Sequence, residues 1–311
     1  MILVAGSANL DFVVRAAHIP APGQTVLGRE LRTYPGGKGA NQAVAAARAG
    51  GALTHMLLAL GQDSHAGVLE ASLAQAGVQM HIVRSATLAT GTAFICVSDD
   101  AENAITVAPG ANDTLGPRHL PELEGCSHLL MQLETPLATI AAYARAARAK
   151  GVRVVLNAAP AQPLAPELLA LVDLLIVNQG ELASITGSHG SIAAALRSLR
   201  VPVVVVTLGA LGCCARSGDR FLLQPAFPVQ PVDTTGAGDT FCGALVAALD
   251  RGAALEQALR EASAAAALAC TLPGAQSAIP ARAAVTALVQ QAAESDPATL
   301  ATLRTQCGLT D

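Results

Sequence analysis

The order of the apolar runs is the feature that most constrains the fold. Continuous apolar runs, each the length of a strand, lie at 2–7, 54–60, 128–133, 152–158, 173–178 and 201–209. Segments typical of helices lie at 41–50, 64–75, 136–150, 181–186, 191–199 and 239–251, and the Ala-rich tail from residue 255 is also predicted to be helical. Strands read as unbroken apolar runs when helices cover both faces of a parallel sheet. We therefore predict an α/β three-layer sandwich with a mostly parallel central sheet.

Two stretches interrupt this pattern because they alternate polar and apolar residues. Residues 11–34 carry turn signals at 19–23, and "GTAFICVSDDAENAITVAPG" at 91–110 is typical of a hairpin. We predict that the two stretches form a small separate sheet, a lid. The predicted α/β domain then comprises residues 1–10, 35–91 and 110–311, and the predicted lid comprises 11–34 and 92–109.

Composition argues against several classes of partner. Only 14% of the residues are charged, the formal net charge is −4, and the chain has just two lysines, Lys38 and Lys150, so a nucleic-acid partner is not expected. No apolar run reaches the ~18 residues that span a bilayer, and the first residues lack the basic region of a signal peptide. The seven cysteines show no C-x-x-C spacing, which favours reduced thiols in a cytoplasmic protein.

The stretch "PGGKGANQA" at 35–43 resembles a phosphate loop without being one. A Walker A loop needs a hydroxyl residue after its lysine, whereas Gly39 follows Lys38, and the dinucleotide fingerprint fails as well. What remains is a backbone with little side-chain bulk, with Lys38 and Asn41 at the mouth of a helix. This suits close approach by a small polar ligand; a plain strand-to-helix turn is the alternative.

A second candidate site is "VDTTGAGDTFCGAL" at 232–245. Gly236, Ala237 and Gly238 precede a predicted helix, so several unpaired N–H groups and the positive end of the helix dipole would face an anion. Asp239 at the same place would repel a phosphate if binding were the only task. As a general base it could deprotonate a hydroxyl while the N–H groups hold a phosphoryl group. The alternative is an acidic residue that merely stabilises the helix start.

A third candidate, "NQGE" at 178–181, follows a predicted parallel strand, and open α/β sheets bind ligands at that end of their strands. Asn178 and Glu181 could organise hydrated Mg²⁺, or they could simply form a capping box. Several other predicted strands are followed by polar residues or glycine: Asn9, Asp11, Glu134, Asn157, Thr207 and Gly209.

Taken together, the motifs resemble those of the ribokinase-like sugar kinase family. The stretches that carry the resemblance run in order from about residue 2 to 285: "GSANLD", "GGKGANQAVAA", "LLMQLE", "LNAAPA", "NQGE", "TLGALG", "DTTGAGDTF" and "GAQSAIP". The resemblance implies an α/β sandwich with a small β lid, and phosphoryl transfer from ATP to O5 of ribose.

The resemblance also implies roles for individual residues. The sugar would be held by Asn9, Asp11, Gly37, Lys38, Asn41, Glu134 and Asp239, of which Asp239 would be the base, and the anion hole would be formed by Gly236, Ala237 and Gly238. The nucleotide would contact Asn178, Thr207, Gly209, Gly212, Gly238 and Ser263, and Glu181 would hold Mg²⁺ through water.

A monovalent cation, K⁺, would be held by the loops that contain Asp233, Thr235, Ala269, Leu272, Gly274 and Ala278. This chain departs from the family there, because Ala278 replaces a common serine and Leu272 and Pro273 replace common basic residues. Ser263 likewise stands where Asn or His is often found beside the adenine.

Two alternatives stay open at this stage: a kinase for another sugar or a nucleoside, and a catalytically silent sugar-binding protein on the same fold. We also expect a homodimer formed through the lid, because a small two-sided sheet has exposed edges and an apolar face.

Overall fold

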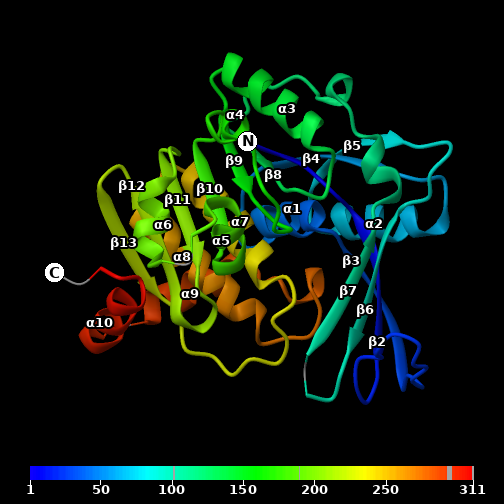
Figure 1. The fold of residues 1–311 in the computed structure, drawn as a ribbon. Coiled ribbons are helices and arrows are strands. Elements are labelled where there is room, and N and C mark those ends of the chain that lie inside the picture. The colour runs from blue at the N-terminus through cyan, green and yellow to red at the C-terminus, as the bar shows by residue number, and fades with distance from the viewer. Residues whose placement is uncertain (101, 189, 293–295, 310–311) are drawn as a thin grey trace.

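The computed structural model describes residues 1–100, 102–188, 190–292 and 296–309. Its centre is a nine-stranded sheet in the order β13-β12-β11-β10-β9-β8-β1-β4-β5 (Figure 1). The seven parallel strands are β1 (Ile2–Ala5), β4 (Thr54–Leu60), β5 (Gln79–Arg84), β8 (His128–Met131), β9 (Arg153–Asn157), β10 (Leu174–Asn178) and β11 (Val203–Thr207). The antiparallel hairpin of β12 (Gly212–Ser217) and β13 (Arg220–Pro225) completes one edge.

Helices cover both faces of this sheet and bury two separate apolar clusters. One face packs against α1 (Lys38–Arg48), α2 (Ser64–Gln75), α7 (Ala237–Asp250), α8 (Leu255–Ala269) and α9 (Arg282–Gln291). The other packs against α3 (Leu137–Ala149), α4 (Pro166–Leu169), α5 (Gln179–Thr186), α6 (Ile192–Ser198) and α10 (Pro297–Gln306). The three-layer α/β sandwich expected from the sequence is therefore confirmed. None of the described helices is both long and apolar enough to span a membrane.

A second, four-stranded sheet extends from the body of the molecule (Figure 1). Its strands are β2 (Asn9–Arg15), β3 (Glu30–Gly36), β6 (Gly91–Val97) and β7 (Asn103–Ala108), in the order β3-β2-β6-β7. The predicted hairpin is β6–β7, and its strand β6 pairs in parallel with β2. This sheet is called the lid below. It combines the two alternating stretches as expected, because β2 and β3 come from the first stretch and β6 and β7 come from the second.

Three strands were absent from the sequence expectations. β5 is amphipathic and only partly buried, and no continuous apolar run marks it. β12 contains Cys213, Cys214 and Arg216, so no continuous apolar run marks it, although both cysteines are fully buried, and β13 is only half-buried over most of its length. The Arg216 guanidinium is buried there because it donates to the backbone carbonyls of Leu196, Leu199 and Val201, at 2.6–2.9 Å.

Candidate active site

Glycines in the 35–43 loop let it lie directly against the turn between β1 and β2. A Cβ on Gly36 would lie 2.1 Å from Oδ2 of Asp11, and one on Gly39 would lie 2.6 Å from the backbone N of Ser7. Gly37 adopts a left-handed φ of 87°, and a Cβ there would lie 2.7 Å from the backbone N of Asn9. The loop is therefore more than a strand-to-helix turn, because its lack of side chains brings α1 onto Asn9 and Asp11.

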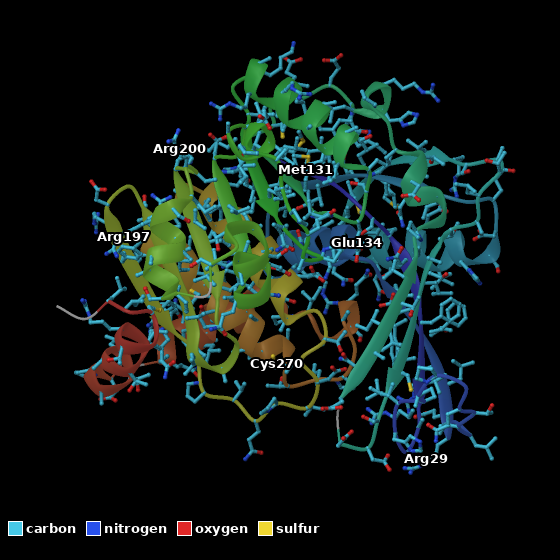
Figure 2. The ribbon with its side chains drawn as sticks, in the orientation of Figure 1. Arg29, Met131, Glu134, Arg197, Arg200 and Cys270 are labelled. Carbon is cyan, nitrogen blue, oxygen red and sulfur yellow. The ribbon has the colours of Figure 1, made fainter. Side chains whose placement is uncertain are left out.

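Two predicted sugar-binding residues are fixed by long-range hydrogen bonds. Oε2 of Glu134 accepts from Oγ of Ser7 at 2.6 Å and from the backbone N–H of Lys38 at 3.1 Å. Oδ1 of Asn9 accepts from Nδ2 of Asn112 at 2.8 Å. Figure 2 shows Glu134 near the junction of the large sheet and the lid, far from Arg29 at the lid tip.

Acidic groups outnumber cations where these residues meet. Burial, together with the nearby carboxylates of Glu134 and Asp239, raises the pKa of Asp11 to about 7, although Lys38 acts in the opposite direction. Burial disfavours the charged form of Lys38, but Asp239, Glu134 and Glu181 together raise its pKa above the ordinary value. Lys38 is thus the cation that balances this buried group of carboxylates.

The start of α7 presents bare backbone N–H groups. Gly236 precedes the helix in a left-handed conformation with φ 74°, which favours glycine. Among the described residues, the N–H groups of Gly238 and Asp239 donate to no protein acceptor, whereas that of Thr240 donates to the Gly236 carbonyl at 2.8 Å. A Cβ on Gly238 would meet open space. The geometry therefore has the properties of an anion site.

Asp239 does not act as an ordinary helix cap. Its Oδ1 accepts from Nε2 of Gln42 at 2.8 Å, and its Oδ2 accepts from Nδ2 of Asn41 at 2.9 Å. Both donors belong to α1, so the carboxylate is held from outside its own helix, and only 8% of the residue is exposed. A carboxylate held beside bare N–H groups can take a proton from a hydroxyl while those groups hold a phosphoryl group.

Asn178 and Glu181 form the capping box that the sequence left open as an alternative. Oδ1 of Asn178 accepts from the Glu181 N–H at 2.8 Å, and Oε2 of Glu181 accepts from the Asn178 N–H at 2.7 Å. The same two residues also line a small cavity of about 160 Å³ together with Lys38, Gly238 and Asp239. Burial raises the pKa of Glu181. The capping role and a place at the site are therefore compatible.

A larger cavity of about 370 Å³ adjoins the start of α7. Its lining is mostly apolar and includes the predicted nucleotide residues Thr207, Gly209, Gly212, Gly238 and Ser263. Gly212 has a φ of 111°, and a Cβ there would lie 2.1 Å from the carbonyl oxygen of Gln224 in β13. The hairpin missing from the sequence expectations thus forms one wall of this cavity, which suits a flat apolar group such as a nucleotide base.

The loops predicted to hold K⁺ are tied to one another. Oδ1 of Asp233 accepts from the Thr235 N–H and Oδ2 accepts from the Gly274 N–H, both at 2.9 Å. Burial opposes ionisation of Asp233, but these hydrogen bonds lower its pKa. The carbonyl of Ala269 accepts from the Leu272 N–H at 3.5 Å, and the Ala278 N–H donates to Ala275 at 3.3 Å.

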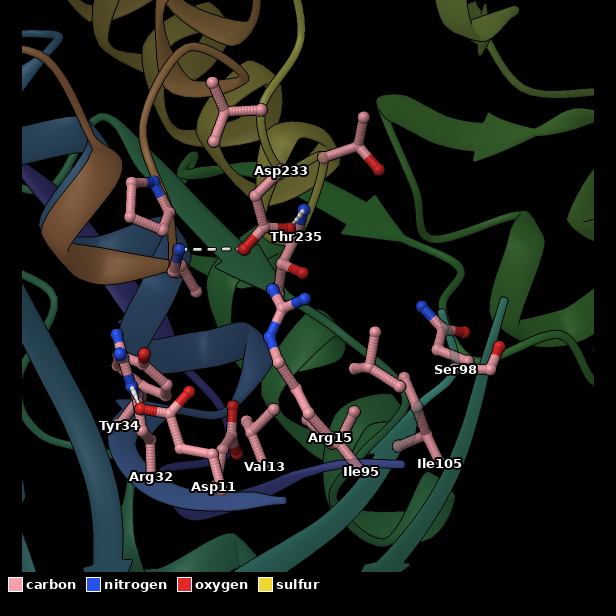
Figure 3. A pocket seen from close by; sticks show the side chains of 18 of the residues that line it. Asp11, Val13, Arg15, Arg32, Tyr34, Ile95, Ser98, Ile105, Asp233 and Thr235 are labelled. Atoms are coloured by element: carbon pink, nitrogen blue, oxygen red, sulfur yellow. Dashed lines mark hydrogen bonds and ion pairs between the residues drawn. The ribbon is translucent and has the colours of Figure 1, made fainter. Parts of the chain in front are cut away.

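The lid and these loops enclose a cleft of about 590 Å³ (Figure 3). Asp11 and Tyr34 line it from the lid, and Asp233 and Thr235 line it from the opposite side. Thr234 lines both this cleft and the apolar cavity, which in turn shares Gly238 with the small cavity at Asp239. The three spaces therefore adjoin one another around the start of α7.

Sequence reasoning missed the buried polar residues that support the site. They are Ser7, Gln42, Asn112, Gln132 and Gln276. A signal existed for Gln42, since an amide inside an Ala-rich helix is unusual unless it has a buried partner. The others follow no local pattern, because their partners lie up to 235 residues away along the chain.

Comparison with known proteins agrees with this geometry. Residues 1–282 match the model of the pfkB family of carbohydrate kinases. The chain is 40% identical to a ribokinase of Haemophilus influenzae over 293 residues, covering 90% of this chain and 95% of that protein. It is 39% identical to a Bacillus subtilis ribokinase, covering 90% of this chain and 96% of that protein.

Among solved structures, Arabidopsis thaliana ribokinase complexed with ribose and ATP superposes with a TM-score of 0.86 at 32% identity, covering 94% of this chain and 99% of that one. The anion site at the start of α7, the Asp239 carboxylate and the lid therefore belong to a fold that matches this ribokinase over nearly its full length. The protein belongs to the pfkB family of carbohydrate kinases.

Proposed function

We propose that this protein transfers the terminal phosphoryl group of ATP to O5 of ribose. The observation that carries the proposal is the convergence of the Asp239 carboxylate and the bare N–H groups of Gly238 and Asp239 at the start of α7. Ribokinases from two bacteria at 39–40% identity, and the fold shared with a ribokinase that binds ribose and ATP, support the choice of substrates.

The acceptor site has the polar groups that a sugar requires. Asp11 and Glu134 can accept hydrogen bonds from hydroxyl groups, and one Nδ2 hydrogen of Asn41 remains after its bond to Asp239. Asn9 and the glycine backbone at Gly37 complete the proposed contacts. Asp239 removes the O5 proton as the new bond to phosphorus forms, and the ADP oxygen leaves on the opposite side.

The phosphate side is built from charge and backbone donors. Lys38 lines the small cavity together with Gly236 and Gly238, so its ammonium can stabilise charge on the phosphoryl group during transfer. Of the predicted anion-hole residues, Gly236 and Gly238 would supply free N–H groups together with Asp239, whereas the Ala237 N–H donates to the Thr234 carbonyl at 3.2 Å. Ser263 lines the proposed adenine cavity.

The residues fit Mg²⁺ and K⁺ in different ways. Both carboxylate oxygens of Glu181 accept hydrogen bonds from Asn178, at 2.7 and 2.9 Å. The remaining lone pairs can accept hydrogen bonds from water molecules bound to Mg²⁺, so Glu181 would hold the ion through water. This suits Mg²⁺, which keeps several waters and neutralises phosphate charge when bound. Asp233 joins the 233–235 loop to Gly274, and we propose that backbone carbonyls of these joined loops hold K⁺.

A panel of acceptors tests the function directly. ADP release would be measured in a coupled assay with ribose, deoxyribose, fructose, fructose 6-phosphate and adenosine, each with and without K⁺. We expect ribose to give the largest kcat/KM and K⁺ to raise it. Tight ribose binding without ADP release would instead favour a silent sugar-binding protein, and preference for another acceptor would overturn the choice of ribose.

The acceptor KM should depend on pH through Asp11. Its pKa of about 7 means that a growing fraction of the carboxyl group is protonated below neutral pH, and a protonated group accepts hydroxyl hydrogen bonds less well. We expect the KM for ribose to rise as the pH falls from 8 to 6, while the KM for ATP changes little. Asp11→Asn should bind ribose weakly and remove most of this pH dependence; a profile like that of the wild type would contradict the assignment.

Structural observations do not favour the other acceptors. Phe12 stacks on Phe94 with 5.4 Å between the ring centroids, and neither ring lines the cleft that Asp11 lines. Of the aromatic residues in the described lid, Tyr34 is the one that lines this cleft. Of the three lid arginines, Arg29 pairs with Asp99 and Arg32 pairs with Glu30, so two candidate contacts for a phosphorylated sugar are already engaged.

We also propose that the protein is a cytoplasmic homodimer that associates through the lid. All seven cysteines are free thiols, as a reducing compartment requires. The lid exposes Leu31, Phe94 and Ile105 by 54–62%, and every residue of the edge strand β7 is exposed. Light scattering at working concentration tests this: the mass of a dimer is expected, and Ile105→Asp should shift it to that of a monomer.

A further inference from the structure

The side chains that hold Asp239 are themselves held by a second layer of amides. Oε1 of Gln42 accepts from Nε2 of Gln132 at 2.6 Å, and Nε2 of Gln42 donates to Oδ1 of Asn157 at 2.9 Å as well as to Asp239. On the other side of the carboxylate, Oδ1 of Asn41 accepts from Nε2 of Gln276 at 3.1 Å. Gln42 and Gln132 are completely buried.

This arrangement leaves Gln42 no freedom to turn over. An ionised carboxylate only accepts hydrogen bonds, so the Gln42 amide must present its NH₂ group to Asp239. Its oxygen then faces the NH₂ group of Gln132, and its second N–H faces Oδ1 of Asn157. Every hydrogen-bonding direction of the Gln42 amide nitrogen is therefore in use, and none is left for a sugar or a phosphate.

Close backbone contacts bring the amides together. A Cβ on Gly243, one turn after Asp239 in α7, would lie 2.4 Å from the carbonyl oxygen of Gln42 in α1. A Cβ on Gly6 would lie 2.0 Å from Oε1 of Gln132. Glycine is thus required both where α7 crosses the Gln42 backbone and after β1 where the Gln132 amide lies, because a side chain at either position would overlap these groups.

We propose that Gln42 is a positioning residue for the transfer reaction, which fixes the direction of the Asp239 carboxylate without touching either substrate. Without it, one oxygen of the carboxylate loses its donor, and the side chain can rotate away from the acceptor hydroxyl. The inference deepens the proposed function and rests on it, since the positioned group is the proposed base.

The test replaces the amide by an apolar side chain of similar size. Gln42→Leu is expected to lower kcat by about 10- to 100-fold, by analogy with the loss seen when a hydrogen-bonding partner that orients a metal ligand is removed. The KM values for ribose and ATP should stay within about twofold, because Gln42 contacts neither. Thr139→Val is the matched control, since it removes another buried hydrogen bond, to the Leu115 carbonyl at 2.8 Å, on the far face of the sheet.

A double-mutant cycle separates positioning from general stability. If Gln42 acts through Asp239, Gln42→Leu should cause little further loss in an Asp239→Asn background. Additive losses, a kcat within about twofold of the wild type, or a raised KM with unchanged kcat would each overturn the proposal. Should Gln42→Leu fail to fold, Gln132→Met leaves Gln42 in place and should give a smaller loss of kcat in the same direction.

A crystal structure of Gln42→Leu supplies a readout that does not depend on turnover. A rotated Asp239 carboxylate supports the proposal, and a carboxylate in the wild-type position overturns it. If the wild type phosphorylates none of the acceptors, the proposed function fails, while this structural comparison still decides whether Gln42 positions Asp239.

Discussion

Asp239→Asn is expected to abolish most turnover while ribose still binds. The substitution keeps the size of the side chain but removes the group that accepts the hydroxyl proton, and general-base catalysis is worth roughly 10²–10⁴ in rate. Because several other polar groups hold the sugar, its affinity should change far less than kcat. The coupled ADP assay measures the first quantity, and isothermal titration calorimetry with ribose measures the second.

Asp250→Asn is the matched control for this experiment. Asp250 ends the same helix, and it pairs with the N-terminal amine at 3.2 Å instead of facing the site. This variant should turn over at the rate of the wild type. Near-full activity of Asp239→Asn would remove Asp239 from the role of base, and with it the central step of the proposed reaction.

Gly39→Ala should damage both stability and activity. The new Cβ would lie 2.6 Å from the Ser7 nitrogen and 2.7 Å from the Ser7 carbonyl oxygen, and both are backbone atoms that cannot rotate aside. Overpacking of this kind costs about 1–3 kcal/mol. To relieve these contacts, α1 would have to move away from the turn that contains Ser7. Ser7 and the Lys38 N–H both hold Glu134, so this shift should raise the acceptor KM. Thermal unfolding and the acceptor titration measure the two effects.

The contrasting variant is Gly67→Ala, in the exposed face of α2. A Cβ there meets nothing within 4 Å, and replacing a helical glycine by alanine stabilises a protein by about 0.4–1 kcal/mol. Its melting temperature should therefore rise slightly and its kinetics should stay unchanged. If Gly39→Ala also unfolded at or above the temperature of the wild type, the close approach of α1 to the β1–β2 turn would be disproved.

Part of the fold followed directly from local pattern. The apolar run of β4 and the helix at Ser64–Gln75 have the bounds that were expected, because burial on both faces of a sheet, or on one face of a helix, leaves a periodic signal. β12 and β13 left no such signal. Arg216 can be buried in β12 because backbone carbonyls, three of them 15 to 20 residues earlier in the chain, accept its hydrogen bonds, and no pattern within the strand itself signals that compensation.

The sequence by itself determined the parallel sheet, the helix start at Gly236–Asp239 and the family resemblance, because all three depend on residues that are neighbours in the chain. Only the tertiary structure decided how Asp239 is held. Its partners Asn41 and Gln42 lie 198 and 197 residues away, and they reach it because two helices cross closely at Gly243. Hydrogen bonds that a buried carboxylate needs can come from any part of the chain, so they become visible only when the helices have packed.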